Sequence, residues 1–461
     1  MELKGKKVLV VGLGKSGLAA ALFLRRRGAQ VTVSDIRSAQ ALGKDIPALI
    51  EQGIAVEAGG HGLLTFRRQD LIVVSPGVPL TTPELAQAQK FGIPIIGEVE
   101  LAARFLKGKV LAITGSNGKT TTTSLCGKIL EKARERVHVG GNIGLPVIGL
   151  VDDSREDVWS VLEVSSFQLE TTETFHPDIA VILNITPDHL DRHGSFENYV
   201  AAKERIFAVQ TAEDMLILNA DDDVASRAAA RAKSQVFWFS RKRAIRQGAF
   251  VHEGVVLFRA SEQAAPEPIL KIEEIPLKGA HNVENVLAAV CAARLAGAAP
   301  EAIRSAVAGF RAVEHRLEFV AEIDGVSYYN DSKATNVDAA IKAIESFPSG
   351  IHLILGGKDK DSDYRQLRPL MAGRVKAVYT IGSAAEKIIT HLDGAVKLVS
   401  AGTLDNAVSL AAEAAEKGDV VLLAPACSSF DQFDNYEHRG QTFKTTVLAR
   451  RGAAAWQNAS A

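Results

Sequence analysis

The sequence predicts an α/β protein of three domains, and three observations lead to this prediction. The chain has 461 residues, more than one hydrophobic core usually serves, and this length corresponds to about three domains of ordinary size. Short apolar runs alternate with helical patterns along the chain, which favours parallel, doubly wound sheets. Hydrophobic residues make up 47% and charged residues 23% of the chain, a balance that excludes disordered, collagenous and disulfide-scaffold proteins.

The first domain is expected at residues 1–97, where a helical pattern at 16–27 lies between apolar runs. These runs have the length of buried strands: 7–11, 30–34, 71–75 and 93–97. The second domain is expected at 98–311, with strands at 109–113, 160–163 and 179–184.

The third domain is expected at 312–461 and should begin near residue 313. Its apolar runs are 351–355, 377–381 and 420–424, and each ends in a polar or glycine-rich loop. Open α/β sheets bind ligands at the carboxyl ends of their strands, so all three domains are expected to bind ligands.

Charge and cysteine content restrict the partners and the compartment. Lys and Arg number 53 and Asp and Glu 54, so the net charge of −1 gives no global field for a polyanion, and we expect no nucleic-acid partner. The basic cluster at 241–246 is expected to be a solvated loop. Cys126, Cys291 and Cys427 lie far apart and are expected to be small buried residues in a reducing compartment. Because no run of about 18 apolar residues occurs, we expect a cytoplasmic protein without membrane insertion.

The motif GLGKSG at 12–17 follows a strand and opens a helix, and Asp35 ends the next strand. Glycines in this setting let a diphosphate approach the backbone at a helix N-terminus. The motif therefore indicates a nucleotide diphosphate of some kind, although a tight structural turn would look the same.

The second domain carries a phosphate-binding loop, TGSNGKT at 114–120, between a strand and an amphipathic helix that should bury Leu125, Ile129 and Leu130. Backbone amides there would hold phosphates, Lys119 would reach the β and γ oxygens, and the Thr120 hydroxyl could bind Mg²⁺. The loop departs from the strict P-loop pattern in its first glycine, and a chance Gly-Lys-Thr turn is the alternative.

Two further segments of the second domain supply possible metal ligands. Glu163 ends a strand and would face the phosphate loop, which suits Mg²⁺, while a salt-bridged surface Glu is the alternative. His189 and His193 have the spacing of zinc ligands, but Pro187 and Gly194 favour a loop or a single turn.

Lys203 falls on the apolar face of a predicted helix, seven residues after Phe196 and together with Tyr199, Val200 and Phe207. An inward lysine must reach solvent, pair with a carboxylate such as Glu163 or Asp188, or lose its charge. The spacing leaves these ordinary explanations and a chemically special lysine both open.

The third domain places Asn-Asp-Ser-Lys-Ala-Thr-Asn at 330–336 between a strand and a helix, and a lysine there is not explained by helix capping alone. GGKDK at 356–360 and PACSSFD at 425–431 also follow strands, and a plain turn is the alternative for each. Together these loops predict a site for a small anionic ligand.

Taken together, these motifs resemble the Mur ligase family, and the resemblance covers essentially the whole chain. The motifs occur in the family's order: GSNGKTT (115–121), GGNIG (140–144), EVSSFQLE (163–170), NITPDHLDRHG (184–194), HNVEN (281–285), EHR (314–316), NDSKATN (330–336) and PACSSFDQF (425–433). The resemblance implies a Rossmann-like N-terminal sheet, a central P-loop ATPase α/β domain and a C-terminal Rossmann-like α/β domain.

Within the family, SPGV at 75–78 and the third-domain motifs resemble the members that join D-glutamate to UDP-N-acetylmuramoyl-L-alanine in cytoplasmic peptidoglycan precursor synthesis. The implied reaction uses ATP to form an acyl phosphate, which the amine of D-glutamate attacks. The implied cofactors are ATP and two Mg²⁺ ions, and the resemblance further implies an N-carboxylated Lys203 and a monomeric enzyme.

The resemblance also implies a role for individual residues. Lys119, Glu163, His189 and Lys203 would be catalytic, and Thr120, Glu163, His189 and the Lys203 carbamate would bind metal. ATP would bind to Gly115, Ser116, Asn117, Gly118, Lys119, Thr120, Thr121, Asn282, Asn285, Arg316 and Asp331. The UDP substrate would bind to Ser16, Asp35, Ile36, Arg37, Ser75, Gly77 and Asn142. D-Glutamate would bind to Lys333, Thr335, Lys360, Ser429, Phe430 and Tyr436.

Other functions remain as alternatives at this point. A related ligase for another amino acid, or a folylpolyglutamate synthetase, would share the central domain and differ in the third. A dehydrogenase would explain only the motif at 12–17, and a nucleotide-dependent binding protein would show no substrate-dependent turnover.

Overall fold

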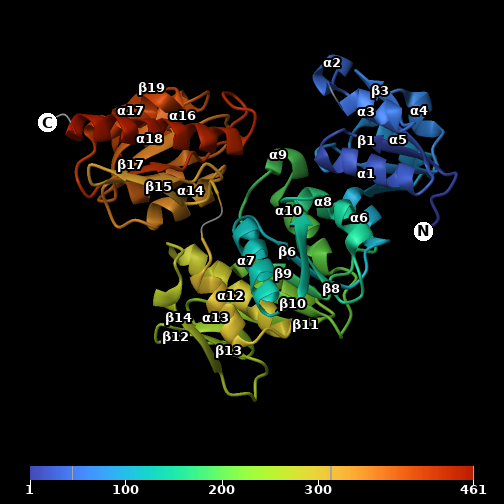
Figure 1. Ribbon diagram of the computed structural model, residues 1–461, viewed down its shortest axis with the longest axis horizontal. Helices are drawn as coiled ribbons and strands as arrows, with labels where there is room; N and C mark the ends of the chain where they lie inside the picture. The colour runs from blue at the N-terminus through green and yellow to red at the C-terminus, as the bar shows by residue number, and fades with distance from the viewer. Residues whose placement is uncertain (44, 312–313, 460–461) are drawn as a thin grey trace. The chain divides into compact units, whose positions relative to one another are not determined.

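A computed structural model describes residues 1–43, 45–311 and 314–459 (Figure 1). They form two compact units, the first made of Met1–Glu274 and Asn285–Ala308, the second of Ile275–Glu284 and Gly309–Ala461. The first unit contains a five-stranded and a nine-stranded sheet, and the second contains a six-stranded sheet. The predicted three-domain α/β fold is therefore confirmed. The expected start of the third domain, at 312–313, lies outside the described residues, and the domain limits stay a prediction.

The N-terminal sheet is parallel throughout, in the order β3-β2-β1-β4-β5. Its strands are β1 (Lys7–Val11), β2 (Gln30–Asp35), β3 (Ala55–Ala58), β4 (Leu71–Val74) and β5 (Ile95–Gly97). Its helices are α1 (Lys15–Arg26), α2 (Ala39–Leu42), α3 (Asp45–Glu51), α4 (Leu63–Arg67), α5 (Pro83–Lys90) and α6 (Glu98–Ala103). Alternate residues of β1 enter two different apolar clusters, so both faces of this sheet are covered.

The central sheet is mixed and has the order β14-β13-β12-β11-β10-β9-β6-β8-β7. Its strands are β6 (Lys109–Thr114), β7 (Arg136–Gly141), β8 (Val158–Glu163), β9 (Ile179–Ile182), β10 (Met215–Asn219), β11 (Gln235–Ser240), β12 (Gly248–His252), β13 (Val255–Arg259) and β14 (Glu267–Lys271). The pairs β12–β13 and β13–β14 are antiparallel and extend the sheet, a feature that the sequence patterns did not predict. The basic cluster at 241–246 lies in the loop between β11 and β12, as expected.

The helices between and after these strands are α7 (Lys119–Lys132), α8 (Ser166–Leu169), α9 (Leu190–His193), α10 (Phe196–Glu204), α11 (Asp223–Ser226), α12 (Ala280–Leu295) and α13 (Pro300–Ala308). Short 3₁₀ turns are η1 (Val147–Asp153), η2 (Arg205–Phe207), η3 (Arg227–Arg231) and η4 (Ile272–Glu274). Leu125, Ile129 and Leu130 of α7 are buried as expected.

The sheet of the second unit has the order β15-β16-β20-β17-β18-β19, with only its edge strand β15 antiparallel. Its strands are β15 (Glu318–Ile323), β16 (Val326–Asn330), β17 (Ile351–Gly356), β18 (Val375–Ile381), β19 (Lys397–Gly402) and β20 (Val420–Leu423). Its helical segments are α14 (Val337–Glu345), η5 (Tyr364–Leu367), α15 (Arg368–Met371), α16 (Ala385–Leu392), α17 (Leu404–Ala414) and α18 (Tyr436–Ala459).

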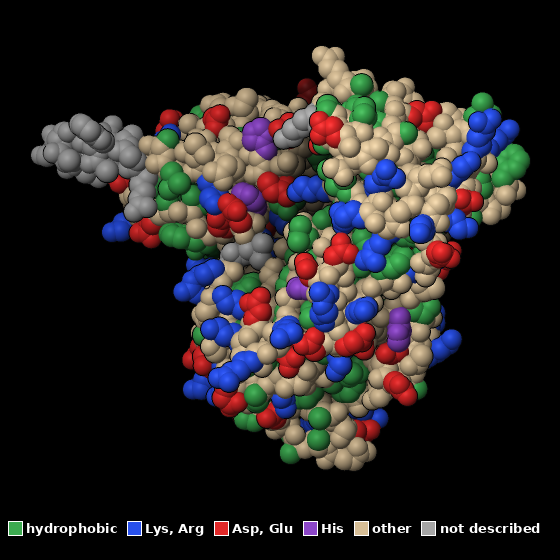
Figure 2. Space-filling view, turned by 45° about the vertical axis from the view of Figure 1, so that its right-hand side comes forward, with side chains coloured by type: hydrophobic (Ala, Val, Ile, Leu, Met, Phe, Trp, Pro, Cys, Tyr) green, Lys and Arg blue, Asp and Glu red, His purple; other side chains and the backbone are tan. Residues whose placement is uncertain are grey.

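The molecular surface matches the balanced composition. Figure 2 shows acidic and basic side chains interspersed over the face in view, without a large patch of one sign there. The three cysteines are free and buried, as expected. Among the residues that the structure describes, no helix is long and apolar enough to cross a membrane.

The carboxyl group of Glu98 is fully buried where the first sheet gives way to the central domain. Its Oε1 accepts a hydrogen bond from the Ile148 amide of η1 at 2.6 Å, while Oε2 has no hydrogen-bond partner among the described residues. Burial raises the pKa of Glu98 from 4.5 to about 7, although the Ile148 bond acts in the opposite direction. The group therefore favours its neutral form in the folded protein.

We expect Glu98→Gln to remove a pH dependence of stability. Below pH 4.5 the Glu98 carboxyl is protonated in both the folded and the unfolded protein. Between about pH 4.5 and 7 only the folded protein keeps the proton, so the free energy of unfolding falls as pH rises. Glutamine keeps the acceptor and cannot ionise, so at pH 8 the variant should be more stable by roughly 3 kcal/mol, and below pH 5 by less than about 1 kcal/mol. Denaturant unfolding across this pH range measures the difference.

Glu100→Gln on the same helix is the matched control. The Glu100 carboxylate accepts hydrogen bonds from the Glu173 and Thr174 amides and pairs with Arg104; these contacts outweigh burial and lower its pKa. That variant should therefore be destabilised at pH 8. If the free energy of unfolding of Glu98→Gln varied with pH as it does in the native protein, Glu98 would not be the neutral carboxyl group that we infer.

Candidate active site

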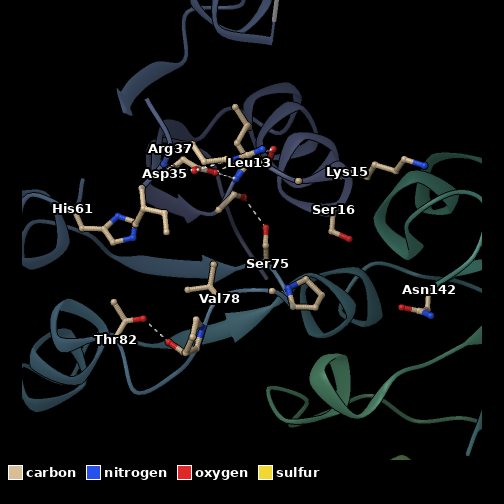
Figure 3. A pocket seen from close by; sticks show the side chains of 16 residues that line it. Leu13, Lys15, Ser16, Asp35, Arg37, His61, Ser75, Val78, Thr82 and Asn142 are labelled. Atoms are coloured by element: carbon tan, nitrogen blue, oxygen red, sulfur yellow. Dashed lines mark hydrogen bonds and ion pairs between the residues drawn. The ribbon is translucent and has the colours of Figure 1, made fainter. Parts of the chain in front are cut away.

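A pocket of about 510 Å³ lies at the carboxyl ends of the first sheet's strands (Figure 3). The seven residues expected to bind the UDP substrate all line it: Ser16, Asp35, Ile36, Arg37, Ser75, Gly77 and Asn142. Asn142 reaches this pocket from the central domain, and Ile36 is 71% exposed beside it. The structure thus brings the expected set together, while its binding role stays a prediction.

Asp35 closes the glycine-rich loop of this pocket. Its Oδ2 accepts hydrogen bonds from the Leu13 amide at 2.7 Å and from Arg37 at 2.9 Å, and its Oδ1 accepts from the Arg37 amide and Nε. Burial alone would raise the pKa of Asp35, but the bonds from Arg37 and Leu13 outweigh it and hold the pKa at about 2. Asp35 is therefore an anchor for Arg37 and the loop.

Ser75 and Gly17 fix the other side of the loop. The Ser75 hydroxyl donates to the Gly12 carbonyl at 2.6 Å, and a Cβ added at Gly17 would lie 1.9 Å from the same carbonyl oxygen. Only glycine at position 17 lets α1 approach the loop this closely.

The phosphate loop after β6 is held by the loop after β9. The Asn117 amide donates to the Asn184 side chain at 2.8 Å, and the Ser116 hydroxyl donates to the Thr186 carbonyl and contacts the Tyr199 hydroxyl, both at 2.9 Å. Thr120 and Thr121 are buried at the start of α7. This strand–loop–helix geometry is the one that presents backbone amides to phosphate groups.

Two lysines converge on one carbonyl oxygen of this loop. Lys119 Nζ and Lys203 Nζ each lie 2.8 Å from the Gly115 oxygen. Lys203 is 1% exposed, as its helical position indicated, and its ammonium lies 4.6 Å from the Tyr199 ring centroid. Burial above all, and then the Lys119 charge, lower the pKa of Lys203 well below 10.5, although Asp188 and Glu163 act in the opposite direction. Lys203 is thus a desolvated amine that does not reach solvent.

Glu163 presents one carboxylate oxygen that the protein does not use. Its Oε1 accepts from the Asn142 amide group at 2.7 Å, whereas its buried Oε2 has no hydrogen-bond partner among the described residues. Glu163 pairs in register with Ile113, the second residue before Gly115. An anionic oxygen beside a phosphate loop suits a hard divalent cation such as Mg²⁺.

His189 and His193 occupy one helical turn but have different surroundings. His189 has a left-handed backbone (φ 54°), a partly exposed ring and an edge contact with Phe167. His193 is buried and contacts Glu170 at 3.0 Å and Ser166 at 3.0 Å, so it is a structural residue. Among the described residues, no three His, Cys, Asp or Glu side chains gather as a closed metal site.

The residues expected to bind ATP fall into two groups, one in each unit. Those at 115–121 and Asn285 belong to the first unit, where a Cβ at Gly118 would lie 2.2 Å from the Asn285 oxygen. Asn282 and Arg316 line a second pocket of about 410 Å³ in the second unit, together with Phe310, Phe319 and Tyr329.

Asp331 is buried in the second unit near Arg316. It accepts a hydrogen bond from the Leu317 amide, and burial raises the pKa of Asp331 to about 6, although Arg316, that hydrogen bond and Lys333 act in the opposite direction. His315 and Leu317, on either side of Arg316, have positive φ angles of 63° and 43°, a strained backbone of the kind found at ligand-binding sites.

The residues expected to bind D-glutamate lie on loops at the carboxyl ends of β16, β17 and β20 and at the start of α18: Lys333, Thr335, Lys360, Ser429, Phe430 and Tyr436. Lys333 Nζ lies 5.1 Å from the Tyr436 ring centroid, and Phe430 is 66% exposed. Backbone hydrogen bonds of Lys358 to Ser428 and of Ala426 to Ala334 join the three loops.

Sequence reasoning missed several residues that shape these sites. Arg439 is fully buried and donates to the Ser332 hydroxyl and to the Ser332, Cys427 and Ser428 carbonyls, which ties two of the ligand loops together. Burial lowers its pKa to about 10. Arg192 donates to the Val78 carbonyl of the first pocket and to Glu170. Each lies within a quoted motif or just after one, and that proximity was the available signal.

Comparison with known proteins matches the whole length of the chain. The family models described as Mur ligase MurD-like N-terminal domain, Mur ligase middle domain and Mur ligase glutamate ligase domain match residues 6–97, 113–293 and 315–427. The UDP-N-acetylmuramoylalanine–D-glutamate ligase of Acidobacterium capsulatum is 85% identical over 461 residues, all of both chains. The enzyme of the same name from Koribacter versatilis is 61% identical over 447 residues, 97% of this chain and 98% of its own.

Solved structures share the fold at low identity. A pseudomurein peptide ligase type C from Methanothermus fervidus has a TM-score of 0.61 at 21% identity, over 96% of this chain and 100% of its own. The UDP-N-acetylmuramate-alanine ligase of Thermotoga maritima has a TM-score of 0.61 at 19% identity, with the same coverage.

The fold, the phosphate loop and these relatives define the class of protein, an ATP-dependent, amide-forming ligase that uses Mg²⁺. The chain belongs to the Mur ligase family.

Proposed function

We propose that this enzyme joins D-glutamate to UDP-N-acetylmuramoyl-L-alanine, in cytoplasmic synthesis of the peptidoglycan precursor. The substrates are those named for the relatives that are 85% and 61% identical to it. The chemistry rests on one observation, the convergence of Lys119 and the desolvated Lys203 on the phosphate loop beside the free oxygen of Glu163. The UDP-N-acetylmuramate-alanine ligase of Thermotoga maritima shares the fold at 19% identity only.

The reaction divides into two steps. A carboxylate oxygen of the L-alanyl group attacks the γ-phosphorus of ATP, ADP leaves, and an acyl phosphate forms. The α-amine of D-glutamate then attacks the acyl carbon; the new C–N bond forms, the amine loses a proton, and phosphate leaves with the former carboxylate oxygen. Lys119 neutralises charge on the transferred phosphoryl group, and the phosphate-loop amides orient it.

Two Mg²⁺ ions are proposed to bind to four ligands: Thr120, Glu163, His189 and Lys203. The orphan oxygen of Glu163 and the partly exposed His189 ring fit this role. Bound Mg²⁺ supplies positive charge that stabilises the anionic phosphoryl oxygens. Asn142 holds Glu163 in place and lines the UDP pocket.

Lys203 is proposed to be N-carboxylated. A neutral amine attacks CO₂, a C–N bond forms and one proton leaves, which gives a carbamate whose single negative charge is shared by two oxygen ligands. The lowered pKa of Lys203 supports this reaction because it raises the fraction of neutral amine.

The site assignments follow the same logic. The first pocket is proposed for the UDP end of the substrate, and the second pocket, which Asn282 and Arg316 line, for the adenosine of ATP. Asn285 and Asp331 are also proposed to bind ATP. Lys333, Thr335, Lys360, Ser429, Phe430 and Tyr436 are proposed to bind D-glutamate, whose two carboxylates suit the lysines. We propose that the enzyme acts as a monomer.

Phosphate release tests the substrate assignment. With ATP, Mg²⁺ and UDP-N-acetylmuramoyl-L-alanine, we expect release on addition of D-glutamate and none with L-glutamate, L-alanine or a diamino acid. Release with one of these amino acids instead would show that the enzyme uses that amino acid and not D-glutamate. No release with any of them would contradict the ligase function.

Lys203→Ala tests the carbamate. Loss of a metal ligand should lower kcat by roughly a hundredfold, and added acetate or formate should restore part of it by supplying a carboxylate. Lys119→Ala is the control, because its ammonium charge cannot be replaced by an acid. ¹³C NMR with labelled bicarbonate should show a carbamate signal in the native enzyme and none in Lys203→Ala. Full activity of Lys203→Ala would refute the assignment.

A further inference from the structure

Lys387 binds the residues on both sides of Lys360. It lies on α16, after β18, and its Nζ contacts Asp359 Oδ2 at 2.7 Å and Asp361 Oδ1 at 3.2 Å. Lys360 is the residue between these two aspartates, on the loop after β17. One ammonium group thus bridges the side chains immediately before and after a residue of the proposed amino-acid site.

Tyr364 connects the same loop to the loop after β20. Its hydroxyl donates to Asp359 Oδ1 at 2.7 Å and lies 2.9 Å from Cys427 Sγ, two residues before Ser429. Tyr364 is fully buried, so this link is shielded from solvent. Tyr364 therefore adds a buried side-chain link to the backbone hydrogen bond from Lys358 to Ser428, which joins the same two loops.

The loop needs such support because its backbone is strained. Asp361 has a positive φ of 58°, which costs free energy for a residue with a side chain. The Asp359 carboxylate also accepts a hydrogen bond from the Ser362 amide. Burial alone would raise the pKa of Asp359, but the bonds from Lys387, Tyr364 and Ser362 outweigh it and lower the pKa.

Charge gives Lys387 a second effect on the site. Asp359 and Asp361 flank Lys360 and would attract its ammonium and repel an anionic substrate if they were unpaired. Lys387 neutralises part of this negative charge at close range. Both effects act on the binding of a dicarboxylate and neither acts on the phosphate loop.

We propose that Lys387 and Tyr364 are positioning residues for the amino-acid substrate, holding Lys360 at a fixed separation from Ser429. This inference rests on the proposed function, because it takes the loops of Lys360 and Ser429 as the amino-acid site. Neither residue needs to touch the substrate.

Steady-state kinetics of Lys387→Ala test the proposal. Loss of two charge-assisted hydrogen bonds should raise the KM for D-glutamate roughly tenfold, while the KM values for ATP and the UDP substrate change by less than about twofold. Lys387→Arg keeps both pairs and should stay within about threefold of the native KM. Tyr364→Phe removes only the hydroxyl and should raise this KM by about fivefold.

Lys376→Ala is the matched control. Lys376, near the start of β18, also bridges two carboxylates, Glu416 at 2.8 Å and Asp419 at 2.9 Å, but has no contact with the ligand loops among the described residues. The KM of the Lys376→Ala variant for D-glutamate should equal that of the native enzyme.

Two outcomes separate the inference from the proposed function. If the native enzyme uses D-glutamate and Lys387→Ala and Tyr364→Phe keep its KM, the positioning role is refuted. If the native enzyme uses another amino acid, the proposed substrate is wrong, and the same comparison of Lys387→Ala with Lys376→Ala is made with that amino acid.

Discussion

The hydrogen bonds from two lysines to the Gly115 carbonyl are the interaction on which the central site depends. Lys119 comes from the phosphate loop and Lys203 from α10, and each lies 2.8 Å from the same oxygen. Burial above all, and then repulsion by the Lys119 ammonium group at the same acceptor, lower the pKa of Lys203 and drive it toward its neutral form. The backbone that presents this carbonyl favours glycine at position 115, because its φ is 152° and a Cβ there would lie 3.0 Å from the Leu183 Cβ. The geometry of one loop therefore sets both the phosphate site and the chemistry of Lys203.

The second unit also has its ligand loops at the carboxyl ends of strands, but different contacts hold these loops in place. Besides backbone hydrogen bonds, side chains that reach between the loops hold them together: Arg439 joins the loops after β16 and β20, and Tyr364 joins those after β17 and β20. Lys387 adds charge balance around Lys360. Buried donors with several acceptors hold a loop more rigidly than backbone contacts alone, which suits a site that must distinguish small amino acids.

Strong local sequence patterns predicted several strands of the three sheets and the buried position of Lys203. The strands 7–11, 109–113 and 351–355 are continuous apolar runs, and the structure confirms them as β1, β6 and β17. Lys203 was expected to point inward because its helical spacing from Phe196 is periodic, and it does. β3 was not predicted because it is short and only half-buried. The antiparallel strands β12–β14 were not predicted because nothing in their sequence pattern fixes the order of strands in a sheet. Glu98, Tyr364, Lys387 and Arg439 each owe their role in part to a partner 28 or more residues away in the sequence, which no local pattern records.

The transfer of a carboxylate oxygen to phosphate tests the central chemistry most directly. UDP-N-acetylmuramoyl-L-alanine labelled with ¹⁸O in its alanyl carboxylate is turned over with ATP and D-glutamate, and the released phosphate is analysed by ³¹P NMR. An acyl phosphate places one labelled oxygen in each phosphate, and the isotope-shifted signal should match the labelling of the substrate. Phosphate without the label would contradict activation of the carboxylate at the phosphate loop.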